Sequence, residues 1–107
     1  MIRGLVIGLA TLSLVVGAQA QTFPSRTVTI VSPYQAGGTS DIIARILAQK
    51  LSERFGQSVV IENRPGANGT IGVNQVVRAD PDGHSLLAVA SSALTLNPIF
   101  YKSLSYD

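Results

Sequence analysis

The chain has 107 residues, with eight lysines and arginines against six acidic residues, one histidine and no cysteine. Its basic residues do not cluster as nucleic-acid binding requires, so we expect no nucleic-acid partner. One histidine without cysteines cannot supply the usual ligand set of a zinc site, and we predict neither a metal nor a cofactor.

The first 20 residues have the three parts of a secretory signal peptide. Arg3 supplies the positive start, a mostly apolar run from Leu5 to Val16 follows, and Ala18 and Ala20 form a small-residue cleavage site. The apolar run is shorter than the roughly 20 residues that span a bilayer, which argues against an uncleaved membrane anchor. We therefore predict cleavage after Ala20 and export to the periplasm.

The mature part, residues 21–107, begins with a predicted strand and a predicted helix. The β-branched residues within Val28–Ser32 favour a strand. From Asp41 to Phe55, apolar residues including Ile43 and Leu47 recur every three to four positions, which predicts an amphipathic helix with an apolar stripe. We expect that stripe to face the core.

Residues of the right type stand at both ends of this helix. Thr39 or Ser40 can cap its start, Asp41 suits the positive first turn, and Gly56 can close its end.

The rest of the chain continues the alternation of strand and helix. The apolar run in Ser58–Glu62 predicts a strand buried on both faces, as in parallel sheets. The order β-α-β-α-β indicates the α/β class, with a parallel sheet and helices on its faces. The later predicted elements are a helix over Thr70–Ala79, a turn over Asp80–Gly83, a strand over His84–Ala90 and a segment over Leu94–Tyr101 that breaks near Asn97 and Pro98.

Three loops rich in small and polar residues follow the three predicted strands: Tyr34–Ser40, Arg64–Gly69 and Ser91–Ala93. In open α/β sheets, ligands bind beyond the carboxyl ends of the strands. Small residues let a ligand approach the backbone, and helix N-termini present N–H groups to anions. The recurrence at three strand ends favours a site for a carboxylate or another small anion.

Each of these features also has a purely structural interpretation. Gly37 and Gly38 fit a tight strand-to-helix turn, and they form neither of the glycine motifs that bind nucleotides. Asp41 fits a first-turn helix acid that accepts backbone N–H bonds, because a carboxylate there would repel an anionic ligand. Asn68 with Gly69 fits a plain turn, and Ser91 and Ser92 fit helix caps.

Catalysis finds little support in the sequence. His84 stands at the start of a strand, where a half-exposed surface residue is the common case. The chain has no cysteine nucleophile and no G-x-S-x-G elbow. We expect no enzyme activity; the one catalytic alternative is a serine hydrolase that uses Ser91 or Ser92 with His84.

The same loops resemble the substrate-binding receptors of the tripartite tricarboxylate transporters, also called Bug proteins. The most specific features are the pattern from Tyr34 to Asp41 and the run Glu62-Asn63-Arg64-Pro65-Gly66. The resemblance extends over the whole mature stretch. Its other segments are Phe23–Arg26, Val31–Pro33, Ile61, Ala67–Gly69, Ala79–Leu87 and Asn97–Tyr101.

The resemblance implies two α/β lobes that close over a ligand, with residues 21–107 as the N-terminal part of lobe one and the second lobe absent. It implies a small carboxylate ligand, delivered to membrane subunits of a transporter or, alternatively, presented to a sensor kinase. The implied ligand contacts are Tyr34, Ala36, Gly38, Thr39, Asn68, Gly69, Ser91 and Ser92, with Asp41 in support.

Overall fold

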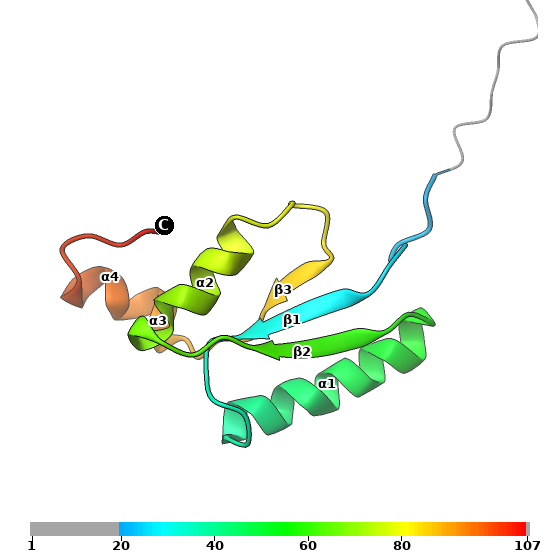
Figure 1. Cartoon of the computed structure of the whole chain (residues 1–107), viewed down its shortest axis with the longest axis horizontal. Coiled ribbons are helices and arrows are strands. Elements are labelled where there is room, and N and C mark those ends of the chain that lie inside the picture. Colours follow the sequence, from blue (N-terminus) through cyan, green and yellow to red (C-terminus); the bar gives the residue numbers. More distant parts are fainter. Residues whose placement is uncertain (1–19, 107) are drawn as a thin grey trace, which may run out of the picture.

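The computed structural model describes residues 20–106, so the predicted signal peptide lies, except for Ala20, outside the described residues. Three parallel strands form one sheet in the order β2-β1-β3. The long helix α1 covers one face, over β1 and β2, and α2 covers the other face, over β1 and β3 (Figure 1). The predicted α/β class with a parallel sheet is confirmed. The elements are β1 (Val28–Ser32), α1 (Thr39–Phe55), β2 (Val59–Asn63), the 3-10 turn η2 (Ala67–Gly69), α2 (Thr70–Val77), β3 (Ser85–Leu87), α3 (Ser92–Thr95) and α4 (Asn97–Phe100).

The central strand β1 carries the core. Val28 and Ile30 are almost fully buried and pack with Ala48 of α1 and Val59 of β2. Successive residues of a strand point to opposite faces, so Val31, also fully buried, lies toward α2. Within residues 20–106, no helix combines the length and the apolarity needed to cross a bilayer.

The prediction for the ends of α1 is correct at the C-terminus and wrong at the N-terminus. Gly56 adopts the left-handed conformation, with φ of 65°, and its N–H donates to Ser52 O at 3.0 Å, as a C-terminal glycine should. At the other end the helix begins two residues earlier than predicted, with Gly38 as N-cap and no side-chain cap. The predicted capping by Thr39 or Ser40 is wrong, because both residues already lie inside the helix.

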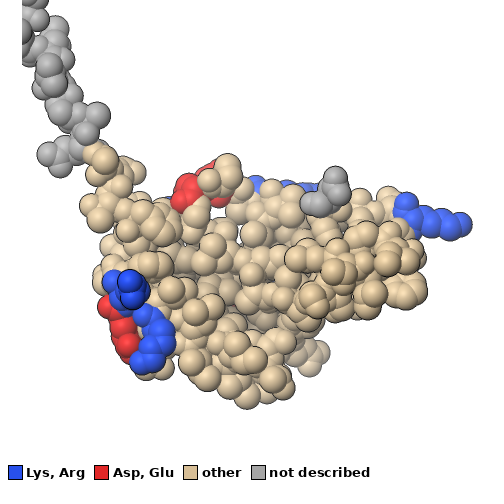
Figure 2. Space-filling model, turned by 180° about the vertical axis from the view of Figure 1, so that it is seen from behind, with Lys and Arg blue, Asp and Glu red and all other residues tan. Residues whose placement is uncertain are grey.

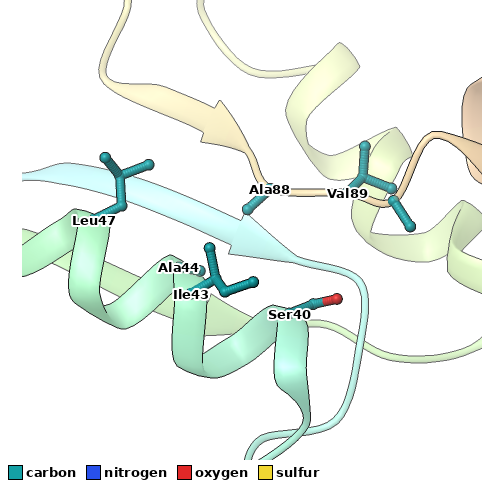
Figure 3. A pocket seen from close by; sticks show the side chains of 7 residues that line it. Ser40, Ile43, Ala44, Leu47, Ala88 and Val89 are labelled. Atoms are coloured by element: carbon teal, nitrogen blue, oxygen red, sulfur yellow. The ribbon is translucent and has the colours of Figure 1, made fainter.

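The apolar stripe of α1 is only partly buried. Ala44 and Ala48 face the sheet, where their small size lets the helix approach the strands closely. Ile43 and Leu47, by contrast, are 62% and 49% exposed. They line an open groove of about 240 Å³ between α1 and Ala88–Ala90 (Figure 3). Leu51 and Phe55, near the end of the helix, do pack against the core as expected.

The two outer strands differ from the predictions. The expectation that β2 is buried on both faces is wrong: β2 is an edge strand, α2 packs over β1 and β3 instead, and Val60 is 44% exposed. The third strand is shorter than predicted: it runs over Ser85–Leu87, the residues that pair with Thr29–Val31 of β1. One further bond, from Ala88 N to Val31 O at 2.9 Å, closes the pairing.

The last two predicted helical segments are confirmed in outline, with shifted bounds. Helix α2 ends at Val77, two residues before the predicted end, and η2 precedes it. The C-terminal segment divides into α3 and α4, and the break before Asn97 lies where the prediction put it. The helical part begins at Ser92, two residues earlier than expected.

His84 is buried at 6% exposure, which contradicts its predicted place on the surface. Its Nε2 accepts a hydrogen bond from Ser25 N at 3.2 Å, and the Phe23 ring packs edge-on against the imidazole. Arg26 and Asp82 form an ion pair at 2.7 Å beside it. These contacts fasten the segment after Ala20 to the turn before β3.

Candidate functional site

The chain reverses its direction of travel across the sheet between β1 and β3. It leaves β1 for β2 on one side and then crosses to β3 on the other side. Ligands of open α/β sheets bind in the crevice outside the carboxyl ends of the strands at such a switch point. The loops that begin at Tyr34 and Ala88 flank this point, and a hydrogen bond from Ala90 N to Tyr34 Oη at 2.9 Å connects them.

A cavity of about 270 Å³ opens beside this connection. It brings together one predicted site residue from each of the three loops: Tyr34, Asn68 and Ser92. Its walls carry hydroxyl and amide groups and no lysine, arginine, histidine or acidic side chain, so it offers uncharged hydrogen-bond donors and acceptors. The remaining lining residues are Ala93, Leu96, Asn97 and Phe100.

The other predicted contacts do not line this cavity. Ala36, Gly38 and Thr39 lie exposed on the loop and first turn that lead into α1. Gly69 is buried under its loop, where an added Cβ would lie 3.6 Å from Pro33. Ser91 is exposed at the start of α3, and its side chain does not cap the helix.

The groove between α1 and the chain after β3 is a second candidate and extends to Ser40 in the first turn of α1 (Figure 3). Ser40 is its one polar side chain, and its other lining residues are alanines, Ile43, Leu47 and Val89. This apolar groove lacks the polar groups that orient a small ligand, so the cavity beside Tyr34 is the better candidate.

Asp41 holds the loop between β1 and α1. Its side chain is buried, and its Oδ2 accepts from Gly37 N at 3.0 Å and from Arg45 Nε at 2.8 Å. Its Oδ1 accepts from Asn63 Nδ2 at 2.9 Å. These donors, with Arg45 foremost, hold the pKa of Asp41 well below its usual range. The carboxylate is therefore charged at neutral pH, and the Arg45 guanidinium compensates its charge.

Asn97 is a residue at the cavity that the sequence analysis did not assign to the site. It is buried, its Oδ1 accepts from Asn68 Nδ2 at 3.2 Å, and its Nδ2 donates to Asn68 O at 3.3 Å and to Tyr106 Oη at 3.1 Å. This reciprocal pair joins the second loop to α4. Asn68 itself has φ of 55°, a left-handed conformation that asparagine tolerates well. Two sequence signals fall on Asn97: its place before Pro98, at the helix break, and its place in the segment Asn97–Tyr101 that resembles the family.

No charged side chain is among the residues that line the cavity. In the view from behind, charged side chains gather near the ends and the upper rim, and most of that face carries none (Figure 2). In the described part of the chain, no three histidine or acidic side chains are grouped closely enough to hold a metal ion.

The serine hydrolase alternative does not fit this geometry. His84 precedes β3, whereas Ser91 and Ser92 follow it, so the strand separates the histidine from both serines. His84 Nε2 is occupied by the Ser25 amide.

Comparisons with known proteins agree on one family. The family model described as the tripartite tricarboxylate transporter family receptor matches residues 43–107. A UPF0065 protein of Bordetella bronchiseptica is 46% identical over 114 residues, which cover 98% of this chain and 34% of that protein. The chain thus spans about a third of the length of the curated relatives it matches.

Two solved structures share the fold at substantial sequence identity. One, described as a periplasmic transporter, is 41% identical with a TM-score of 0.76 and covers 79% of this chain and 29% of its own. The other is R. palustris Rpa4515 with adipate, 39% identical with a TM-score of 0.75, covering 79% of this chain and 28% of its own. The chain belongs to the receptor family of the tripartite tricarboxylate transporters.

Proposed function

We propose that residues 21–107 form the N-terminal part of the first lobe of a periplasmic receptor that captures a small carboxylate. In this proposal the receptor delivers its ligand to the membrane subunits of a tripartite tricarboxylate-type transporter. The remainder of lobe one and the second lobe come from a longer protein, of which this chain is a piece. Residues 1–20 act as the signal peptide and are removed after Ala20.

The observation that carries the proposal is the uncharged, polar cavity at the switch point of the sheet. Tyr34, Asn68 and Ser92 supply hydroxyl and amide groups to it. The first turn of α1, which follows the loop that begins at Tyr34 and does not line the cavity, has N–H groups without a partner within the helix, and the helix dipole there favours a negative charge. The adipate in the Rpa4515 structure, a dicarboxylate held by a relative, supports the same ligand class.

The proposed ligand contacts are those expected from the sequence, in two groups. Tyr34, Asn68 and Ser92 contact the ligand from the cavity wall. Ala36, Gly38, Thr39, Gly69 and Ser91 contribute backbone or hydroxyl groups from the loop rims, and Asp41 supports the first loop.

Thermal-shift measurements on the full-length protein test the binding proposal. Di- and tricarboxylates, adipate among them, are screened against their amides as uncharged controls. A true ligand at about 100 times its Kd should stabilise the protein by roughly 2.7 kcal/mol. Failure of every carboxylate to shift the transition contradicts the proposal.

Two variants localise the site on the cavity. Asn68→Ala should weaken binding, whereas Asn74→Ala, a matched change on α2 outside the cavity lining, should not. Equal effects of the two substitutions contradict the assignment. Co-purification from membranes then identifies the partner, since transporter membrane subunits support delivery and a sensor kinase supports presentation to a signalling protein.

A further inference from the structure

Asn63, the last residue of β2, makes three side-chain hydrogen bonds at the base of the candidate site. Its Nδ2 donates to Tyr34 O at 3.1 Å and to Asp41 Oδ1 at 2.9 Å. Its Oδ1 accepts from Arg45 Nη2 at 3.2 Å. The side chain therefore contacts both the loop after β1 and the first two turns of α1.

This set of partners fixes the orientation of the Asn63 amide. Both Nδ2 hydrogens point at oxygen atoms, and Oδ1 faces a guanidinium. Turning the amide over would place Oδ1 against the Tyr34 carbonyl and the Asp41 carboxylate, which donate nothing. Asparagine thus supplies a pattern of donors and acceptor that aspartate, of the same shape, cannot supply.

The contact with Tyr34 extends to the third loop. The Tyr34 carbonyl accepts from Asn63, while the Tyr34 hydroxyl accepts from Ala90 N at 2.9 Å. Tyr34 also lines the cavity. One residue at the end of β2 is therefore connected, through Tyr34, to the backbone of the loop after β3.

We infer that Asn63 is a positioning residue for the carboxylate site. It holds Tyr34 in place and, through Tyr34, the loop after β3 at Ala90, so that both have the arrangement that binds the ligand. The inference rests on the proposed function. Asn63 is not among the residues that line the cavity, so its effect on binding is indirect.

The test compares two substitutions in the full-length protein. Asn63→Asp keeps the side-chain shape and replaces the donors with oxygens that face Tyr34 O and Asp41. Gln75→Ala is the control. Gln75, on α2, donates from Nε2 to Glu62 Oε2 at 2.8 Å, and Glu62 precedes Asn63 in β2. This hydrogen bond involves none of the three site loops. We expect Asn63→Asp to lower affinity for the carboxylate that binds the wild type by tenfold or more, and Gln75→Ala to change it less than twofold.

A pH series separates positioning from a general loss of structure. The introduced carboxyl lies between the Asp41 carboxylate, whose like charge raises its pKa, and the Arg45 guanidinium, whose opposite charge lowers it. Acidification below its pKa should protonate it and restore one donor, so the ratio of variant to wild-type affinity should rise as pH falls. Taking the ratio cancels protonation of the ligand. A ratio that stays flat, or an affinity equal to that of the wild type, overturns the inference.

Amide hydrogen exchange in the ligand-free protein gives a readout that does not depend on the proposed function. Asn63→Asp should speed exchange at Ala90 N, 27 residues away in the sequence, while Gln75→Ala should leave it unchanged. If no carboxylate binds the wild type, the proposed function fails and the Ala90 exchange rate still decides the role of Asn63. Unchanged Ala90 protection in Asn63→Asp contradicts that role.

Discussion

The Asp41 carboxylate is buried beside loops that, in our proposal, receive a second carboxylate. Two like charges in such a place repel, yet Arg45, Asn63 and Gly37 all donate to Asp41. The Arg45 guanidinium compensates the charge. The hydrogen bonds from Gly37 and Asn63 to Asp41 hold the loop between β1 and α1 in place. The residue therefore stabilises the site without contacting the ligand in our proposal.

Asp41→Asn should make the free energy of unfolding depend less on pH in the acid range. Arg45, then Asn63 and Gly37, lower the pKa of Asp41 in the folded state. A lowered folded-state pKa contributes stability that is fully present above the unfolded value of about 3.9 and is lost as pH falls below it. Urea unfolding of both proteins between pH 7 and pH 3 should show a steeper loss for the wild type below about pH 4.

The pKa values of Glu62 and Asp82 are also lowered, by Gln75 and Arg64 and by the His84 amide and Arg26 respectively. Both groups are present in the wild type and in Asp41→Asn, so their contribution cancels in the difference between the two curves. Parallel curves over the whole range contradict the role assigned to Asp41.

At the scale of elements, α2 packs on the end of β1 through Gly72. A Cβ at Gly72 would lie 2.8 Å from Pro33 Cβ, 3.0 Å from Pro33 Cα and 3.1 Å from Arg64 O. Gly72→Ala should therefore destabilise the fold by about 1–3 kcal/mol, as overpacking does, despite a helix-propensity gain of up to about 1 kcal/mol. Chemical denaturation measures the difference.

Gly38→Ala is the matched control for this packing prediction. Gly38 has φ of −77°, and an added Cβ there would meet only Gln35 O at 3.8 Å. Because Gly38 is the N-cap of α1 and alanine is a poorer N-cap residue than glycine, the substitution should still cost something, but less than about 1 kcal/mol. Equal costs at the two glycines would show that α2 is not tightly packed against Pro33.

Local signals in the sequence predict those parts of the fold that depend on local interactions. Strand β1 has the predicted bounds, and Gly56 ends α1 through its own left-handed backbone. The exposure of Val60 was not predictable in this way, because it depends on which strand occupies the centre of the sheet. The strand order is set by pairings between segments far apart in the chain.

The same distinction between local signals and contacts between distant segments applies to the candidate site. Small and polar residues at strand ends pointed to three loops, and the family resemblance implied Tyr34, Asn68 and Ser92 within them; the structure places these three residues around one cavity. Asn63 and Asn97 were not assigned to the site. Their bonds join residues 22 and 29 positions apart, and a single asparagine at a strand end or before a proline carries no sign of such a partner.

At the scale of the whole molecule, apolar side chains remain exposed on α1 and α4. Ile43 and Leu47 line an open groove, and Ile99 and Phe100 are 74% and 75% exposed. Fully burying one such side chain stabilises a protein by about 1.5–3 kcal/mol. In the longer receptor that we propose, further chain covers some of this surface.

Ile43→Asn tests that coverage in two contexts. In the isolated polypeptide 21–107, the side chain is exposed and the change should cost less than about 0.5 kcal/mol. In the full-length protein, it should cost about 1.5–3 kcal/mol, since a buried apolar group is lost. Gln49→Ala, on the polar face of α1, should have little effect in either context. A small cost of Ile43→Asn in both contexts would show that Ile43 stays exposed in the full-length receptor.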